Sequence, residues 1–235
     1  MYKKKIIITR PKEQARHFVE QLCTEIADLN FCDFVFEPVL KIKALKFDMP
    51  DFKKYDGIIV TSQHALKFLD RSLIQNTPLY CVGQKCGDAK IRAATAHDLK
   101  NEIITDLLQK KARLLYLRGQ DVSLDMAEAL SRAGHHVDER IIYEAVGVDM
   151  LHNALVEQFQ KGDIGAITFF SKRSAETFFD LAFAAAIIPL MNDIKILCIS
   201  DLVVNYVHTV LNAHAYSANS PDGDGMIRLI ETHCL

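Results

Sequence analysis

The sequence lacks an excess of charge of either sign: 28 lysines and arginines stand against 30 aspartates and glutamates, a net charge of −2. With 49% hydrophobic residues as well, this balance excludes intrinsic disorder as the state of the whole chain. It also argues against a protein devoted to coating DNA, which needs a strongly basic domain or stripe. An anionic ligand must therefore be held by local groups and not by the field of the whole molecule.

Long hydrophobic runs are missing as well. The longest apolar stretch, 181–191, contains Pro189 and is far shorter than the ~20 residues that a membrane helix needs. The apolar run after Lys3–Lys5 is too short for a signal peptide and ends in Arg10-Pro11. We therefore expect a cytoplasmic protein that has no membrane partner.

Cysteine pairs of the kind that bind metals are also absent. The six cysteines form no Cys-x-x-Cys pair and show no spacing typical of a zinc site. A chain of 235 residues buries enough surface to be stable without cross-links. We therefore expect reduced, mostly buried thiols, and no metal, at Cys23, Cys32, Cys81, Cys86, Cys198 and Cys234.

Several signatures of cofactor and nucleophile sites do not occur. The absence of G-x-G-x-x-G and G-x-x-x-x-G-K-[ST] argues against a nucleotide-dependent transferase, and no G-x-S-x-G frames a serine nucleophile. The segment 222–225 lacks the further ligands of a calcium loop, so we predict that an aspartate caps the final helix there. His135 and His136 lie on a predicted strand, point to opposite faces and are expected to be surface histidines.

What the sequence contains is a regular alternation of short β-rich runs with helical stretches. A helix is predicted over 12–29, where Ala15, Phe18 and Leu22 recur at helical spacing. Apolar strands separated by helices are typical of parallel sheets covered on both faces, so the fold class is α/β. The predicted strands are 5–9, 57–61, 79–82, 113–117, 164–169, 195–199 and 214–217.

Two stretches break this alternation. Segments 38–46 and 140–147 alternate apolar and polar residues without an obvious helix beside them, which predicts two half-exposed strands. If the two pair, they form a β connector between two domains. Domain one then consists of 1–37 plus 148–235, and domain two of 47–139.

A faint internal similarity supports two similar domains, each an open parallel sheet flanked by helices. Segment 61–68 is similar to 170–178 with one residue inserted, and in both an apolar strand ends near a serine and a helix begins. Leu117-Arg118-Gly119 likewise matches the strand end at Ile8-Thr9-Arg10-Pro11.

In open parallel sheets, ligands bind beyond the carboxyl ends of the strands, where loops lead into helix N-termini. The unpaired N–H groups there suit carboxylates or phosphates, and several of these loops carry a cation. Helix capping is the alternative role for each serine, threonine, aspartate or asparagine among them. The residues at these positions are Arg10, Thr61 to His64, Gly83 to Lys85, Arg118 with Gly119, Ser171 to Arg173, Ser200 with Asp201, and Asn219.

Tyr143 lies on the predicted connector, next to any cleft between the two domains. Its phenol has an ordinary pKa near ~10, so it can donate a proton or a hydrogen bond to a leaving oxygen. The alternative that stays open is an aromatic side chain that covers a domain junction.

Taken in order, these motifs resemble the uroporphyrinogen-III synthase family over essentially the whole chain. The Ser-Gln-His-Ala form and Cys198-Ile199-Ser200 are similar to a variant found in some bacteria. The motifs that carry the resemblance are Ile8-Thr9-Arg10-Pro11, Thr61-Ser62-Gln63-His64-Ala65, Val82-Gly83, Leu117-Arg118-Gly119, Ile142-Tyr143, Thr168-Phe169-Phe170-Ser171 and Ala218-Asn219-Ser220-Pro221-Asp222.

The resemblance implies two α/β domains, a two-stranded β connector and a substrate cleft between the domains. It implies a cyclising lyase that dehydrates hydroxymethylbilane, forms a spiro intermediate at ring D and releases uroporphyrinogen III with that ring inverted. No cofactor and no metal would be used. Tyr143 falls on the tyrosine proposed to assist loss of the hydroxyl, and Thr61, Ser62 and Ser171 fall near the bound tetrapyrrole.

The substrate of that family is a linear tetrapyrrole polycarboxylate, so its partners are small molecules and not nucleic acid. We expect a monomer that takes its substrate by transient handover from hydroxymethylbilane synthase. We expect local N–H groups and a few cations, Arg173 among them, to bind the carboxylates of the substrate. The expected binding positions are Arg10, Thr61, Ser62, Gln63, His64, Gly83, Lys85, Arg118, Gly119, Ser171, Lys172, Ser200 and Asn219.

The chain departs from the family pattern in two loops. Cys86 stands where the family often has a threonine, and Ser200 replaces a glycine. Leu202 and Val203 replace hydroxyl residues, so backbone groups would have to carry more of the binding. The rival hypothesis is a non-catalytic two-domain binding protein for an acidic small molecule, in which Tyr143 would be structural.

Overall fold

The computed structural model describes residues 4–26, 29–30, 33–74, 76–83, 86–122 and 124–234. The chain divides into two compact units: unit 1 is Met1–Lys41 with Gly147–Leu235, and unit 2 is Ile42–Val146. Both divisions fall inside the segments that the sequence predicts as the connector. The sheet order and the cores given below confirm the predicted α/β class with two helix-flanked, mainly parallel sheets.

Unit 1 is built on a five-stranded sheet in the order β11-β10-β9-β1-β2, and every pair in it is parallel. Its strands are β1 Lys5–Ile8, β2 Phe34–Phe36, β9 Ile164–Phe169, β10 Lys195–Cys198 and β11 Ala215–Ser217. Its helices are α1 Lys12–Glu25, α6 Asn153–Gln160, α7 Lys172–Ala184, the 3₁₀ helix Ile188–Met191, α8 Asp201–Val210 and α9 Gly223–Cys234.

The unit 1 sheet is buried on both faces because successive side chains of its strands point to opposite sides. In β1, Ile7 packs into the core with α6, α7 and α8, whereas Ile6 and Ile8 pack into the core with α1 and α9. The continuous apolar run of this strand therefore has a partner on each side. This explains why the strand carries no polar alternation.

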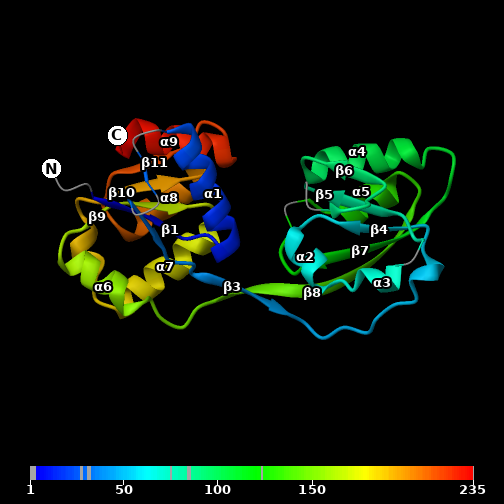
Figure 1. Ribbon diagram of the computed structural model, residues 1–235, viewed down its shortest axis with the longest axis horizontal. Coiled ribbons are helices and arrows are strands. Elements are labelled where there is room, and N and C mark those ends of the chain that lie inside the picture. The colour runs from blue at the N-terminus through cyan, green and yellow to red at the C-terminus, as the bar shows by residue number, and fades with distance from the viewer. Residues whose placement is uncertain are drawn as a thin grey trace. The chain divides into compact units, whose positions relative to one another are not determined.

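Unit 2 is built on a six-stranded sheet in the order β3-β8-β7-β4-β5-β6. Helices cover both faces of this sheet (Figure 1). Ile58 and Val60 pack in one core with Phe52, Ala65 and Ile74, whereas Ile59 packs in the other with Leu99 and Leu130. Its strands are β3 Leu40–Ala44, β4 Gly57–Val60, β5 Leu79–Val82, β6 Ile91–Ala93, β7 Arg113–Gly119 and β8 His136–Gly147. Its helices are η2 Phe52–Lys54, α2 Gln63–Phe68, α3 Arg71–Ile74, α4 Ala96–Asp106 and α5 Met126–Arg132.

The two strands predicted as a connector are neighbours. The backbone N–H of Leu45 donates to the Ile142 carbonyl, and that of Val148 donates to the Val39 carbonyl. Since one residue number rises as the other falls, β3 and β8 run in opposite directions. All other pairs of the unit 2 sheet are parallel.

Some local predictions need correction. The short strands β2 and β6 were not predicted, and α1 ends at Glu25 instead of continuing to 29. His135 is not a surface residue: it is only 8% exposed, and its Nδ1 accepts a hydrogen bond from the Ala112 N–H. The predicted cap of the last helix is confirmed, because the Asp222 carboxylate accepts from the Gly225 N–H at 2.8 Å.

Within the described ranges, no helix is both long enough and apolar enough to cross a membrane.

Candidate active site

The carboxyl ends of the parallel strands in unit 2 surround a pocket of about 240 Å³. Strand β4 leads into Thr61 and Ser62, β5 ends at Val82 and β7 ends at Gly119, so three of the strand ends at which a ligand was predicted to bind meet here. The chief polar and backbone groups that line the pocket are Thr61, Ser62, Tyr116, Gly119, Asp121 and Tyr143.

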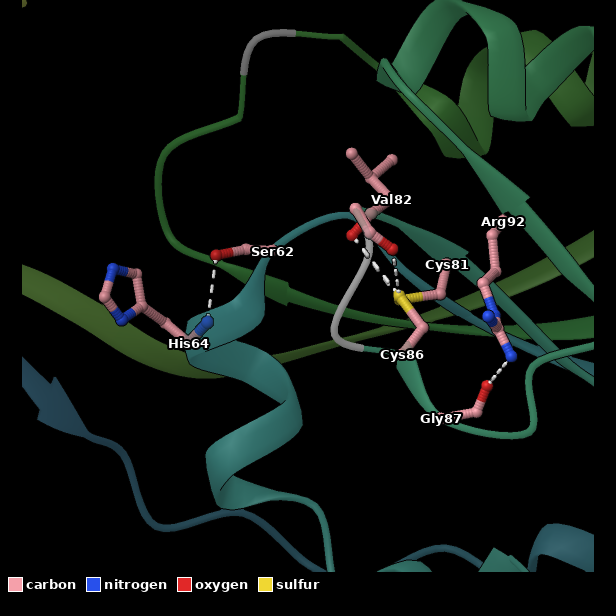
Figure 2. The surroundings of a disulfide bond; sticks show 8 residues. Ser62, His64, Cys81, Val82, Cys86, Gly87 and Arg92 are labelled. Carbon is pink, nitrogen blue, oxygen red and sulfur yellow. Dashed lines mark hydrogen bonds between the residues drawn. A yellow bond between two sulfur atoms is a disulfide. The ribbon is translucent and has the colours of Figure 1, made fainter. Parts of the chain in front are cut away.

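Ser62 is both a helix cap and a pocket residue. Its side chain accepts a hydrogen bond from the His64 N–H at 3.2 Å, which starts helix α2 (Figure 2). The capping alternative is therefore correct for this residue, but it does not remove Ser62 from the pocket. A serine cap leaves the hydroxyl proton free to serve another group.

Tyr143 reaches the pocket from β8 and is half-buried. Its ring lies 5.9 Å from the His64 ring and 6.1 Å from the Phe68 ring, between centroids. Burial raises the pKa of the phenol, the Ser62 side chain lowers it by a smaller amount, and the charge of Asp121 raises it further. Tyr143 therefore stays protonated at neutral pH and acts as a hydrogen-bond donor.

Gly119 makes room for that phenol. A Cβ atom at this position would lie 2.6 Å from Tyr143 Cζ and 2.9 Å from the phenol oxygen. Separations this short do not occur between non-bonded carbon atoms, so any larger residue would displace the ring. Gly119 was predicted as a binding residue, and its position against Tyr143 gives it a second reason to be glycine.

Tyr116 and Asp121 are polar pocket residues that the sequence did not predict. The Tyr116 hydroxyl lies 2.8 Å from the Thr61 hydroxyl, and the side chain is 1% exposed. Burial raises the pKa of this phenol as well. No sequence signal marks Tyr116, because an aromatic residue in a buried strand is expected to be core.

A disulfide joins Cys81 in β5 to Cys86, which follows that strand (Figure 2). This corrects the expectation of reduced thiols at these two positions, whereas Cys23, Cys198 and Cys234 are free. Cys86 Sγ also lies 2.9 Å from the Gly83 carbonyl oxygen, which is a contact and not a hydrogen bond because a disulfide sulfur carries no proton. Cys32 lies outside the described residues.

Within the cross-linked segment, Val82 at the end of β5 lines the pocket. Gly83 has a φ of 97°, in the left-handed region that glycine adopts at no steric cost. Lys85, a predicted cation of this loop, lies outside the described residues. Gln63 is exposed on the neighbouring helix.

Arg118 does not line the pocket. Its Nε donates to Glu139 Oε1 at 2.6 Å, and its Nη1 donates to the carbonyls of Gly119 and Gln120. The guanidinium therefore holds the turn that follows β7. This placement gives it an indirect role in the site, by fixing the backbone beside Tyr143.

Unit 1 presents a second cluster at the carboxyl ends of its own strands. The Arg10 guanidinium lies 4.4 Å over the Phe170 ring, and burial lowers its pKa. Arginine stays charged in proteins, so this is a partly desolvated cation, and its Nη2 donates to Gln14 Oε1 at 3.4 Å. Ser171 caps α7 by accepting from the Ser174 N–H at 3.1 Å.

The other predicted residues of unit 1 are more exposed. Lys172 is paired with Glu176 one turn along α7, at 3.3 Å between Nζ and Oε1. Ser200 precedes α8 but its side chain makes no capping hydrogen bond, and Asn219 follows β11 on the surface. Arg173 is exposed at the start of α7.

A buried carboxylate in unit 1 also escaped sequence analysis. Glu37 is 1% exposed, and its two carboxylate oxygens bind the backbone N–H of His152 at 3.0 Å and the His152 ring at 2.8 Å. It joins the chain after β2 to the start of α6. In the part of the chain that the structure describes, no three His, Cys, Asp or Glu residues gather as a metal site would require.

Fold and site together define a protein of two α/β units, each with polar loops at the carboxyl ends of its sheet. The family model described as uroporphyrinogen-III synthase HemD matches residues 21–228. This match spans most of the chain, which therefore belongs to the uroporphyrinogen-III synthase family, the cyclising lyases of tetrapyrrole biosynthesis.

Individual relatives agree with that assignment. A uroporphyrinogen-III synthase from Chlorobaculum parvum (strain DSM 263 / NCIMB 8327) is 24% identical over 200 residues, which cover 75% of this chain and 78% of the relative. The crystal structure of uroporphyrinogen-III synthetase from Helicobacter pylori 26695 matches with a TM-score of 0.61 at 15% identity, over 97% of this chain and 99% of that one. The structural likeness shows that the fold is shared.

Proposed function

We propose that this chain converts hydroxymethylbilane to uroporphyrinogen III, with the Tyr143 phenol as the group that assists departure of the hydroxyl. The hydroxymethyl C–O bond breaks and the oxygen leaves as water after gaining one proton. A carbon–carbon bond closes at ring D to give a spiro intermediate. Rearrangement of that ring and loss of one proton then yield the type III isomer.

The observation that carries this proposal is the protonated, half-buried phenol of Tyr143 in a pocket that also contains two aliphatic hydroxyls. A phenol whose pKa is raised is a weak acid but a persistent hydrogen-bond donor. Donation to the leaving oxygen stabilises negative charge that develops on it as the C–O bond breaks.

The second requirement is conformational. The substrate also closes without help, to the isomer in which ring D is not inverted, so the enzyme must hold one folded conformation of a flexible chain. The enzyme can hold this conformation by binding the carboxylates of the substrate. In unit 2 the donors are Thr61, Ser62 and loop N–H groups, and in unit 1 they are Arg10 and the N-terminal loops of α7 and α8.

The experiment that tests the role of Tyr143 is Tyr143→Phe. Phenylalanine fills the same space against Gly119 but has no proton to donate. We expect kcat for the type III isomer to fall on the order of 10²-fold, with KM changed little. A kcat equal to that of the wild type would remove the phenol from the mechanism.

The pH profile gives an independent readout of the same group. Because the pKa of Tyr143 is raised by burial, its proton is retained through neutral and mildly alkaline solution. Wild-type kcat should show no alkaline loss due to Tyr143 up to about pH 9. An alkaline loss below that pH that disappears in Tyr143→Phe would contradict a raised pKa.

We also propose that the protein works as a monomer in the cytoplasm and takes hydroxymethylbilane by transient handover from hydroxymethylbilane synthase. The argument is kinetic, because a substrate that cyclises unaided is lost to the type I isomer while it diffuses. Light scattering on the pure protein tests the monomer. Adding excess Tyr143→Phe protein as a trap tests the handover: a direct transfer keeps the type III yield, and free diffusion lowers it.

A further inference from the structure

Tyr116 carries a hydroxyl that the core does not need. The side chain is 1% exposed on β7, between Leu115 and Leu117, and it packs in the same apolar cluster as Leu114 and Ile59. A phenylalanine would fill this place equally well. Burying a hydroxyl costs free energy unless it makes a hydrogen bond, so its single contact matters.

That contact is a hydrogen bond between two hydroxyl groups. Among the described residues, Thr61 Oγ1 at 2.8 Å is the one hydrogen-bond partner of the Tyr116 hydroxyl. Either hydroxyl could donate in this bond, and because a phenol is the more acidic of the two, we take Tyr116 as the donor and the threonine oxygen as the acceptor. Burial keeps the phenol protonated, in agreement with its raised pKa.

The consequence falls on Thr61. A threonine hydroxyl has one proton and two lone pairs, and Tyr116 occupies a lone pair. The threonine proton is then left to point elsewhere, and Thr61 is half-buried at the wall of the pocket. Tyr116 thereby converts a hydroxyl that could donate or accept into one that donates into the pocket.

We infer that Tyr116 is a positioning residue that holds the Thr61 hydroxyl as a hydrogen-bond donor to a carboxylate of the tetrapyrrole substrate. This inference rests on the proposed function. A carboxylate accepts hydrogen bonds and donates none, so a hydroxyl committed to donation suits it. Tyr143 and Tyr116 then have separate tasks: Tyr143 acts on the leaving oxygen, and Tyr116 acts on binding through Thr61.

The test is Tyr116→Phe with Tyr80→Phe as its matched control. Tyr80 lies on β5, which is separated from β7 by β4 in the same sheet, is 0% exposed and donates to Asp106 Oδ2 at 2.7 Å, but it does not line the pocket. We expect KM to rise by ~10-fold in Tyr116→Phe, with kcat nearly unchanged, and both constants to stay at wild-type values in Tyr80→Phe. Thermal melting of both variants measures the cost to the fold separately.

A double-mutant cycle decides whether Tyr116 acts through Thr61. Thr61→Val should raise KM by a similar factor, and adding Tyr116→Phe to it should raise KM no further. Thr61→Ser, which keeps the hydroxyl, should remain close to the wild type. An unchanged KM in Tyr116→Phe, or additive effects in the cycle, would overturn the inference.

The wild-type reaction separates this inference from the proposed function. If the wild type forms no type III isomer, the proposed function itself fails. If the wild type is active and Tyr116→Phe keeps the wild-type KM, only the role of Tyr116 fails.

Discussion

Two tyrosines on neighbouring strands meet two hydroxyl residues at the end of a third strand. Tyr116 on β7 is hydrogen-bonded to Thr61, and Tyr143 on β8 interacts with Ser62. Both phenols have a raised pKa because both are withdrawn from water. At the scale of single residues, the site therefore combines neutral hydroxyl donors with the carboxylate of Asp121, and the donors suit a leaving hydroxyl and carboxylates.

Gly119 offers the sharpest test of how Tyr143 is held. In Gly119→Ala the added methyl group would lie 2.6 Å from Tyr143 Cζ, so the ring must move away from its position. We expect kcat to fall on the order of 10²-fold, as in Tyr143→Phe, although the phenol is still present. The control is Gly223→Ala at the start of α9, where an added Cβ meets no atom within 4 Å. Equal activity of both variants would mean that the ring position is not critical.

Arg10 gives a second test at this scale. Its guanidinium is desolvated over Phe170, and a charge-assisted hydrogen bond to a carboxylate there is worth roughly 1.5–3 kcal/mol. Arg10→Ala should therefore raise KM at least ~10-fold. Arg16→Ala is the control, because Arg16 lies on α1, which begins two residues after Arg10, but is exposed and forms an ion pair with Glu20. Identical KM values for the two variants would exclude Arg10 from binding.

At the scale of elements, the pattern of apolar residues predicted the strands best. The apolar strands 57–61, 79–82, 113–117, 164–169 and 195–199 are all present because burial on both faces demands continuous hydrophobic runs. The serines that begin α2 and α7 are caps, as the two similar segments indicate. Strands β2 and β6 were missed because three residues at a sheet edge leave too short a pattern to recognise.

Contacts between residues on different strands could not be predicted from the sequence. The sequence does not predict that Tyr116 contacts Thr61, or that Glu37 contacts His152. The residues of each pair are far apart in the sequence and come together only when the chain folds. Arg118 was expected at the substrate but binds Glu139 and two carbonyls. The position of the loops was predictable, whereas the direction of each side chain was not.

The loop between Cys81 and Cys86 yields a prediction for one element. Cross-linking residues five apart restricts the unfolded chain and stabilises the fold by about 2 kcal/mol on the loop-entropy account. Protein unfolded without reductant should leave both cysteines unreactive to alkylation, and reduction should lower the melting temperature. In Cys86→Ser the reductant should have no such effect. Alkylation of both thiols before reduction would show that the bond is absent.

At the scale of the whole molecule, carboxylates in unit 2 predict how acid affects that unit. In unit 2, Asp56 pairs with Lys110 and accepts from the Arg113 N–H, and these bonds lower its pKa; Lys90 does the same for Asp106. A carboxylate whose pKa is lower in the folded state stabilises the fold fully above its unfolded pKa, near ~4. That stabilisation is lost as the pH falls through the folded value.

We therefore expect the melting temperature of unit 2 to drop below about pH 4, and the drop to be smaller in Asp56→Asn. Asp56 precedes β4, at the opposite end of the strand from Thr61, so this variant should keep its activity at neutral pH. Hydrogen exchange read out by mass spectrometry would follow each unit separately. An identical acid dependence in wild type and variant would show that Asp56 does not contribute.

The central claim concerns the whole enzyme, and a coupled isomer assay tests it most directly. Fresh hydroxymethylbilane is mixed with the purified protein, the products are oxidised and the uroporphyrin isomers are separated by chromatography. We predict a product dominated by the type III isomer, formed faster than spontaneous closure. Type I isomer alone, at the spontaneous rate, would contradict the account.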